Sequence, residues 1–381
     1  MSRAEGLLIR GARIAHLIES DGPGGAERMV AQLAGELEGA GCPCVAFVPA
    51  GGEGWLGREL TAAGVTVETF QLTRPFSPQL SRELVTAFRR HRIDLAHGHE
   101  FSMAFYGAWA ARRAGVPHVI TMHGGRYYAD RLRRRLVMRA AVTASGALVA
   151  VSEGLRTHLA HDLWLGAKRI TTIPNGVRFR PAAESTLRGE LRLVPDDRLV
   201  VAVGNLYPVK GHRYLLDALA RLAGDHPNLH VAIAGRGELA TTLQEQAAAL
   251  GIGARCHLLG LRPDVANVLA AADLFALPSL SEGLPLALLE AMFAARPIVA
   301  SAVGDVPVAL ASGAAGVLVP PGDAAALADA IHRLLAQPFE AQRLSQSAQA
   351  RAAAEYGIER MVQRYAGLYE RLLANGARAR V

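Results

Sequence analysis

One pattern constrains the fold of this chain more than any other: short apolar strands alternate with amphipathic helices through the first half, and the alternation resumes after a break. In the first half we expect strands at residues 14–18, 45–48, 66–70, 95–97, 118–121 and 147–151. In the second half we expect them at residues 199–203, 230–234, 257–259, 274–276, 298–300 and 316–319. Strands separated by helices of about 10–15 residues predict βαβ units and parallel sheets covered on both faces, so ligands should bind at the carboxyl ends of the strands.

The break between the two halves is rich in residues that interrupt regular structure. Pro174, Asn175 and Gly176 open it, and Pro181 and Pro195 follow, which is typical of a linker. The end of the sequence is helical again, with an apolar face formed by Met361, Tyr365, Leu368, Tyr369 and Leu372. The expected fold class is therefore α/β, with two doubly wound parallel-sheet domains and a cleft between them.

Composition excludes several classes of protein. With 51% hydrophobic and 20% charged residues, the chain of 381 residues can bury a core, which excludes wholesale disorder. No apolar run approaches the roughly 18 residues that a membrane-spanning helix needs. The apolar stretch 6–9 is broken by Arg10 and Arg13 and is too short for a signal peptide. Three cysteines are too few for a disulfide framework, and Cys42 and Cys44 are expected to fill space beside a strand. We expect a cytoplasmic protein.

The basic residues are unevenly distributed in two respects. Residues 1–180 hold 23 basic and 15 acidic residues, whereas the remainder holds 18 and 19, so the first half is where an anionic partner is expected. Nucleic acid, phospholipid and an acidic substrate all fit that charge. Of the 41 basic residues only Lys168 and Lys210 are lysines. Each lysine is thus a position where arginine, the prevailing basic residue, was not used.

Glycine-rich loops follow the first strand of each half. Residues 22–27 (Gly-Pro-Gly-Gly-Ala-Glu) open the first helix, where free backbone N–H groups can bind an anion, although a simple tight turn explains them equally well. In the second half, residues 204–211 place Lys210 beside a glycine at a helix start. That arrangement suits a diphosphate. A solvated surface lysine is the alternative, and the arginine bias argues against it.

Two glutamates eight positions apart are the most informative feature. Glu282 lies in a loop, and Glu290 lies inside an apolar helix that we expect to begin near Leu284. A carboxylate among apolar residues is costly to bury unless something hydrogen-bonds to it, and a pair of sugar or ribose hydroxyls would do so. A structural carboxylate paired with an arginine is the alternative.

With these motifs in view, the chain resembles the retaining glycosyltransferases of the GT-B fold, family 4, also called glycosyl transferases group 1. The resemblance spans nearly the whole chain. It rests on an ordered set of motifs: Gly-Gly-Ala-Glu-Arg at 24–28, Thr-Met-His-Gly at 121–124, Val-Ser-Glu at 151–153, Ile-Pro-Asn-Gly-Val at 173–177, the loop 203–211, Ile-Ala-Gly-Arg-Gly-Glu at 233–238, Glu282 with Glu290, and Gly-Asp-Val-Pro at 304–307.

The resemblance implies a domain plan. It implies an acceptor-side Rossmann-like domain at residues 1–178 and a donor-binding domain at residues 179–357. The helix at about 358–381 is expected to pack back on the first domain.

It also implies roles for individual residues. Lys210 matches the lysine that holds the donor diphosphate, Glu282 the glutamate that bonds the transferred sugar, and Glu290 the one that bonds the ribose. The resemblance makes His123, Lys210 and Glu282 the candidate catalytic residues, with His123 near the donor sugar. The expected donor-binding set is Gly24, Gly25, Asn205, Lys210, Gly235, Glu238, Glu282, Gly283, Leu284 and Glu290. One departure is Asn205, which stands where family members commonly have arginine, so one cation on the diphosphate is missing.

The resemblance further implies the reaction and its partners. A sugar is transferred from a UDP- or GDP-linked donor to a hydroxyl of a glycan or lipid-linked acceptor, with retention at the anomeric carbon, in cell-envelope glycan synthesis. No Asp-x-Asp triplet occurs, so we expect no metal and no cofactor beyond the nucleotide sugar, and no nucleic acid partner. A sugar-nucleotide epimerase of the same fold and a non-catalytic basic binding protein are the alternatives. A dinucleotide oxidoreductase would need a GxGxxG loop that the first strand lacks.

The acceptor side is expected to carry a basic amphipathic helix. Arg126, Arg131, Arg134 and Arg135 alternate there with apolar residues, which favours either contact with an anionic membrane surface or a phosphorylated lipid-linked glycan, or else a solvated helix whose apolar side packs on the sheet. His97 and His99 end a strand nearby. We expect them to line the cleft, with His99 on the acceptor face, because no third and fourth metal ligand is evident.

Overall fold

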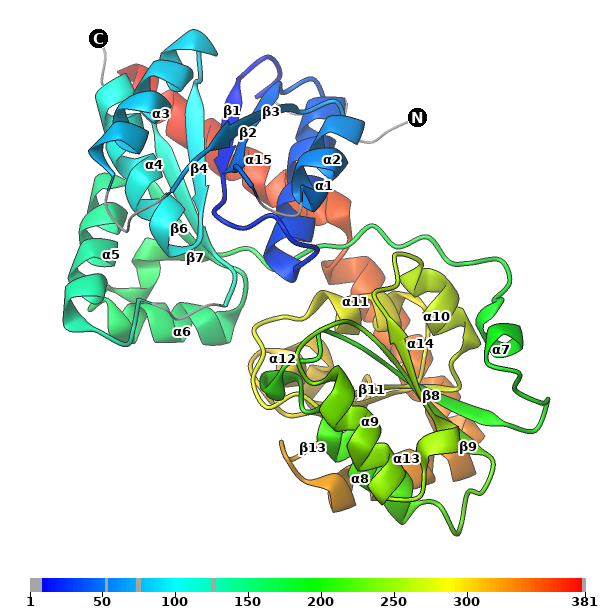
Figure 1. The fold of residues 1–381 in the computed structure, drawn as a ribbon. Coiled ribbons are helices and arrows are strands. Elements are labelled where there is room, and N and C mark those ends of the chain that lie inside the picture. The colour runs from blue at the N-terminus through cyan, green and yellow to red at the C-terminus, as the bar shows by residue number, and fades with distance from the viewer. Residues whose placement is uncertain (1–8, 52–53, 73–76, 125–127, 379–381) are drawn as a thin grey trace. The chain divides into compact units, whose positions relative to one another are not determined.

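The computed structural model describes residues 9–51, 54–72, 77–124 and 128–378 (Figure 1). The chain divides into two compact units, residues 1–177 together with 357–381, and residues 178–356. These boundaries lie within a residue of those expected from the sequence. Among the described residues no helix combines the length and the hydropathy needed to cross a membrane.

The first unit is built on a seven-stranded parallel sheet with the order β3-β2-β1-β4-β5-β6-β7. Its strands are β1 (Ile14–Leu17), β2 (Cys44–Pro49), β3 (Thr66–Phe70), β4 (Leu95–His99), β5 (His118–Met122), β6 (Ala147–Ala150) and β7 (Ile170–Thr172). Its α-helices are α1 (Gly25–Gly39), α2 (Trp55–Ala62), α3 (Pro78–Arg90), α4 (Glu100–Ala114), α5 (Leu132–Ala144), α6 (Glu153–Asp162) and α15 (Ile358–Arg378). Because the strand order reverses between β1 and β4, their carboxyl ends form the point where such a sheet offers a crevice.

The second unit repeats the plan with a six-stranded parallel sheet in the order β10-β9-β8-β11-β12-β13. Its strands are β8 (Arg198–Val203), β9 (Leu229–Ala234), β10 (Cys256–Gly260), β11 (Leu274–Leu277), β12 (Ile298–Ser301) and β13 (Val317–Val319). Its α-helices are α7 (Leu187–Glu190), α8 (His212–Arg221), α9 (Ala240–Ala249), α10 (Val265–Ala271), α11 (Leu286–Phe293), α12 (Val306–Ala309), α13 (Ala324–Ala336) and α14 (Pro338–Glu355). Here the order reverses between β8 and β11.

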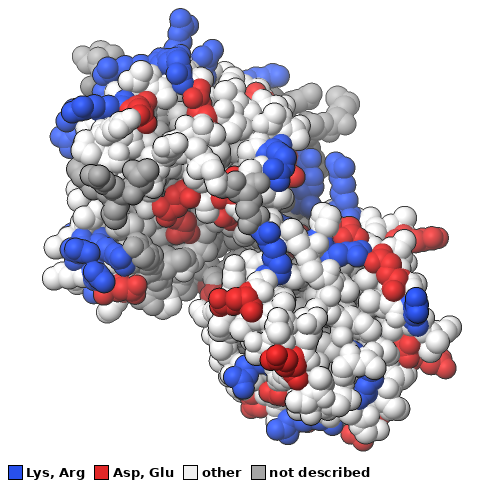
Figure 2. Space-filling model, in the orientation of Figure 1, with Lys and Arg blue, Asp and Glu red and all other residues white. Residues whose placement is uncertain are grey.

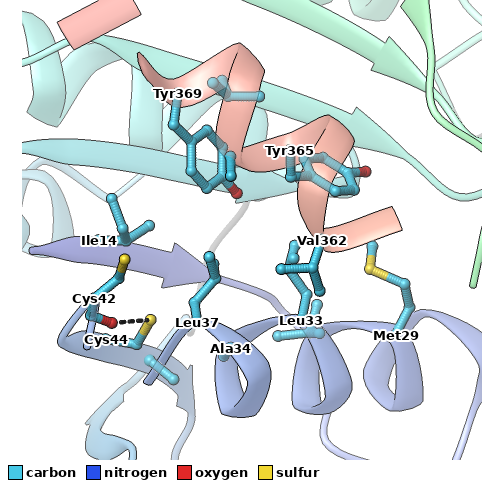
Figure 3. Packing of buried hydrophobic residues seen from close by; sticks show 14 of the residues in the cluster. Ile14, Met29, Leu33, Ala34, Leu37, Cys42, Cys44, Val362, Tyr365 and Tyr369 are labelled. Atoms are coloured by element: carbon cyan, nitrogen blue, oxygen red, sulfur yellow. Dashed lines mark hydrogen bonds between the residues drawn. The ribbon is translucent and has the colours of Figure 1, made fainter. Parts of the chain in front are cut away.

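The last helix, α15, completes the core of the first unit. Its residues Val362, Tyr365 and Tyr369 are buried in one apolar cluster with Leu33 and Leu37 of α1 (Figure 3). The period of the apolar face in the sequence produces this contact, because residues three and four apart share one side of a helix. Cys42 and Cys44 are buried in the same cluster, which confirms that they fill space, Cys42 just before β2 and Cys44 as its first residue.

Helix α15 also brings polar groups into that core. The Tyr369 hydroxyl lies 2.6 Å from His97 Nδ1, and Thr121 Oγ1 lies 2.7 Å from His97 Nε2. The Tyr365 hydroxyl bonds Thr121 in turn, at 3.1 Å. All four side chains are fully buried and out of reach of water. Each hydrogen bond therefore offsets the cost of removing its two polar groups from solvent.

We therefore expect Tyr369→Phe to destabilise the first unit although it removes a single oxygen. His97 Nδ1 would be left buried and unpaired, which costs about 1–3 kcal/mol. Native-state hydrogen exchange of the β4 amides measures that loss. The control is Tyr207→Phe, whose side chain is 46% exposed. Equal protection in the two variants would contradict the role given to the Tyr369 hydroxyl.

Candidate functional site

In the second unit, the loops that follow β8 and β11 bring two charged side chains together. Lys210 ends the short 3-10 turn Pro208–Lys210 after β8, and Glu282 lies between β11 and α11. Lys210 Nζ is 2.8 Å from Glu282 Oε1 and 3.0 Å from Oε2. Ser279 Oγ donates a further hydrogen bond of 2.7 Å to Oε1. The Glu282 side chain is 8% exposed and that of Lys210 26%, so the pair lies just beneath the surface with the cation reachable from solvent.

Two glycines allow the surrounding loops to approach closely. At Gly235, after β9, a Cβ would overlap the Gly204 carbonyl group. At Gly304, after β12, φ is +53° and a Cβ would overlap the Glu282 carbonyl oxygen. Asp305 N also donates to Gly283 O, at 3.0 Å. The backbone that carries Glu282 is therefore fixed by packing against a turn that only glycine fits.

The other residues of the expected donor site lie in loops at the same edge of the sheet, and they differ in how exposed they are. Asn205 is half-buried in the loop after β8, and Glu238 is exposed in the loop after β9. Leu284 is buried, whereas Gly283 is half-buried. Helix α11 begins at Leu286, two residues later than expected.

Glu290 corrects an expectation. The apolar residues around it predicted a buried carboxylate, but the structure leaves Glu290 partly exposed, while its neighbours Leu288, Leu289 and Ala291 are buried. The reason is helical periodicity: Glu290 lies on the side of α11 that turns away from the core.

Sequence reasoning missed His212, the first residue of α8. Its ring is buried, and Nε2 lies 3.3 Å from Gly204 O in the loop that carries Lys210. Burial lowers the pKa of His212 to about 4, so the ring is neutral and supports the loop through a hydrogen bond rather than a charge. Nothing in the local sequence pattern distinguishes it from a surface histidine beside Lys210.

In the first unit, the loop after β1 leads directly into a helix start. Gly24 is the N-cap of α1, and Gly25 is its first residue and is exposed. The backbone N–H groups of a first helical turn have no partner within the helix, as an anion site requires. Glu27 is buried in the same turn, which places a carboxylate close to these N–H groups.

His123 follows β5 and is held from two directions. Its ring Nε2 lies 3.1 Å from His99 Nδ1, and its backbone N–H donates to Glu100 Oε1 at 2.8 Å. Glu100 begins α4 with φ +62°, a left-handed conformation that is costly for a residue with a Cβ. Burial, together with the charges of Glu19 and Glu27, raises the pKa of Glu100 to about 7, although the hydrogen bond from the His123 backbone N–H lowers it. Sequence reasoning missed Glu100, because its only signal is its position after a strand.

The structure corrects the expectation for His97 and His99. Both are completely buried in β4, so they neither line an open cleft nor belong to an acceptor face. The physical reason is that β4 lies in the middle of the sheet, between β1 and β5, with helices on both faces.

The basic segment is divided between structural and solvated arginines. Arg135 donates to Asp162 O at 2.7 Å, and its guanidinium lies 4.6 Å from the centre of the Trp164 ring. It therefore ties α5 to the end of α6 rather than facing a ligand. Arg131 is exposed, Arg134 lies 3.9 Å from Asp130, and Arg126 lies outside the described residues. Blue side chains gather in Figure 2 over the place where Figure 1 shows α5.

The apolar residues of α5 are divided as well. Met138, Ala141 and Val142 pack inward, as a helix lying on the sheet requires. Leu132 and Leu136, however, are 61% and 52% exposed, next to the exposed arginines. The expected packing of the helix by its apolar side therefore holds for Met138, Ala141 and Val142 but not for Leu132 and Leu136.

Two family models match the chain, "Glycosyltransferase Family 4" over residues 23–179 and "Glycosyl transferases group 1" over residues 184–351. A D-inositol 3-phosphate glycosyltransferase of Frankia alni is 33% identical over 68% of this chain and 70% of its own length. This chain belongs to the group 1 glycosyltransferases. An alpha-D-kanosaminyltransferase of Streptomyces kanamyceticus is 29% identical over 71% of this chain and 74% of its own.

Solved structures agree with this assignment. Anabaena HepE in complex with UDP matches with a TM-score of 0.83 and 25% identity, covering 94% of this chain and 100% of that one. The same protein has been solved with UDP-glucose. A glycosyltransferase of Rickettsia africae matches the fold with a TM-score of 0.86 at 18% identity, covering 96% of this chain and 99% of that one. The expected GT-B class, with two Rossmann-like parallel-sheet domains, is confirmed.

The raised pKa of Glu100 predicts a pH dependence of stability. In the unfolded chain the carboxyl group ionises near its ordinary pKa of 4.5, but in the folded protein only near 7. The folded state holds the extra proton between these values, so this contribution is complete below pH 4.5 and is lost as the pH rises to 7, by about 3 kcal/mol.

Glu100→Gln removes this contribution and provides the measurement. We expect the free energy of unfolding of the wild type, relative to the variant, to fall between pH 5 and pH 8. The buried histidines, whose pKa values are lowered, act in the opposite direction, but they are present in both proteins and cancel in the difference. A difference that does not change with pH would contradict the raised pKa.

Proposed function

We propose that this glycosyltransferase moves a hexose from a nucleotide diphosphate sugar to a hydroxyl of a glycan or lipid-linked acceptor, with retention at the anomeric carbon and without a metal ion. The observation that carries the proposal is the pair of Lys210 and Glu282 at the carboxyl edge of the second sheet, where its strand order reverses. HepE, whose structure matches the chain closely, binds UDP and UDP-glucose, which favours a UDP-linked donor, with GDP as the alternative.

The chemistry of the pair supports a donor site. Lys210 is a cation with a partly exposed ammonium group, able to exchange its contact with Glu282 for oxygens of a diphosphate. Glu282 would then be free to accept hydrogen bonds from hydroxyls of the transferred sugar. Asn205, Gly235 and Glu238 would contact the nucleotide from the loops after β8 and β9, and Glu290 the ribose. In this proposal Gly24 and Gly25 supply N–H groups to the diphosphate and His123 lies near the sugar.

The proposed reaction needs no nucleophile from the protein. The bond between the anomeric carbon and the leaving phosphate oxygen breaks, and the acceptor oxygen bonds to the same face of that carbon. The proton of the acceptor hydroxyl passes to the leaving phosphate. Lys210 stabilises the negative charge that develops on the diphosphate, and the remaining residues hold donor and acceptor in position.

A pair of variants tests the donor site, and a matched control is available. Lys210→Ala and Glu282→Gln should each lower transfer and donor hydrolysis by about 100-fold or more, the usual cost of removing a charge-stabilising group. The control is Lys168→Ala, which removes the other lysine from an exposed 3-10 turn. A panel of UDP- and GDP-linked sugars provides the assay. Near-normal turnover in both site variants would refute the assignment.

For the acceptor side we propose contact with an anionic lipid surface or a phosphorylated lipid-linked glycan, in the synthesis of a cell-envelope glycan on the inner side of the plasma membrane. What favours this is the exposed pair Leu132 and Leu136 on α5, beside the exposed Arg133 of the same helix and Arg131 at its N-cap. Apolar residues beside arginines suit the boundary between headgroups and acyl chains.

We expect Leu132→Ser with Leu136→Ser to reduce sedimentation of the full chain with phosphatidylglycerol vesicles. Binding should fall because the variant has less apolar surface to bury in the membrane. Comparison with net-neutral phosphatidylcholine vesicles measures the electrostatic contribution to binding. Leu250→Ser, at a residue 38% exposed in the second unit, is the matched control. Equal, negligible binding of the wild type to both vesicle types would end the membrane proposal.

A further inference from the structure

Three histidine rings form a hydrogen-bonded chain within the first unit. His16 Nδ1 lies 3.3 Å from His99 Nε2, and His99 Nδ1 lies 3.1 Å from His123 Nε2. Strand register explains the geometry. His16 pairs with His97, two residues before His99, and His99 pairs with Thr121, two residues before His123. Each step of the chain therefore crosses one strand and advances two residues along the same face of the sheet.

Both ends of the chain are buried nitrogens. His16 Nε2 and His123 Nδ1 have no hydrogen-bond partner among the described residues. The two ends differ in position, because His16 belongs to β1 and is completely buried, whereas His123 follows β5 at the carboxyl edge of the sheet and is only half-buried as a residue. The edge is where a ligand of the first unit is expected.

The three rings are neutral. Burial lowers the pKa of His16 and His123 to about 3 and lowers that of His99 well below its ordinary value. A neutral imidazole has one N–H and one lone pair, so each ring that donates through one nitrogen must accept through the other. The position of the proton on any one ring then fixes its position on the other two.

The completely buried end of the hydrogen-bonded chain, His16 Nε2, decides the direction in which its hydrogen bonds run. A buried N–H without a partner is rarer in proteins than an acceptor without one, so His16 Nε2 is best left as the lone pair. His16 then donates from Nδ1 to His99, and His99 donates from Nδ1 to His123 Nε2. We propose that His16 and His99 are positioning residues that hold His123 as the tautomer protonated on Nδ1, so that it presents an N–H donor to an oxygen of the sugar donor. This inference rests on the proposed function, which supplies the ligand oxygen that the otherwise unpaired His123 N–H would bond.

A metal site is the competing interpretation, because ring nitrogens of His16, His97 and His99 lie within 4.8 Å of one another. Both nitrogens of His97 already bond hydroxyl groups, those of Tyr369 and Thr121. Both nitrogens of His99 bond other histidines. Coordination through these two residues would break bonds that the buried rings need, so the hydrogen-bonded chain accounts for the cluster better.

The test is a long-range ¹H–¹⁵N spectrum of the full chain with ¹⁵N-labelled histidine, which reports the protonated nitrogen of each ring. We expect His16, His99 and His123 each to be neutral and protonated on Nδ1 between pH 5 and pH 8. His99→Phe removes the donor to His123, so His123 should become a mixture of its two neutral tautomers. His99→Asn should keep the tautomer protonated on Nδ1, because the side-chain NH2 of Asn can donate to His123 Nε2 in place of His99 Nδ1. His123 protonated on Nε2 in the wild type, or unchanged in His99→Phe, would overturn the proposal.

Two further variants keep the test decisive. If His99→Phe does not fold, His16→Phe removes the other link and should also shift His123. His118→Asn is the matched control: His118 is equally buried in β5, bonds Ser145 at 2.7 Å and lies outside the chain of three rings. The last experiment is a zinc titration. A stoichiometric zinc site in the wild type that is lost in His16→Phe would overturn the proposal in favour of a metal site.

Enzyme activity provides a second measurement, which a purely structural role of His99 would leave unchanged. His99→Phe should lower kcat about tenfold, with KM for the sugar donor nearly unchanged, and His99→Asn should recover most of the loss. The failures are distinguishable. A wild type without transfer activity refutes the proposed function and leaves the tautomer result standing. An active wild type whose His123 is indifferent to His99 refutes the positioning role alone.

Discussion

The fold depends on one constraint: both faces of each parallel sheet are covered by helices, so polar chemistry has little room except at the carboxyl ends of the strands. In the second unit this constraint brings Lys210 and Glu282 together across 72 residues of sequence, because β8 and β11 are neighbours in the sheet. The glycines after β9 and β12 then let the loops close around the pair. The site follows from the strand order more than from any local motif.

The first unit accommodates an exception to that constraint. Its central strands carry histidines inside the sheet, where ionised side chains would be very costly. The cost is limited because the rings are neutral and because hydroxyl groups reach them from β5 and α15. Helix α15 thus has two roles, since it covers the apolar side of α1 and supplies the partners that a buried imidazole needs.

The sequence predicted the fold well because alternating periodicity is a strong signal. The expected strands agree with the observed ones to within one or two residues, although the alternating pattern did not include β7. The family resemblance assigned Lys210 and Glu282 to one donor site, and the two side chains are in contact. The errors share a cause. His99 was expected on a surface and Glu290 in a core, because residue type alone does not say which way a side chain turns. Glu100, His212 and Ser279 were missed because their roles depend on neighbours brought together only by folding.

The position of α15 has a consequence for the order in which the protein folds during synthesis. The core of the first unit is incomplete without Tyr365 and Tyr369, yet these residues leave the ribosome long after β1 and β4. The second unit, residues 178–356, has its own sheet and core and requires none of them. Domains usually complete folding from the N-terminus onward. In this chain the middle segment is the one that can finish first, and the unit that begins the sequence must remain open until the last helix arrives.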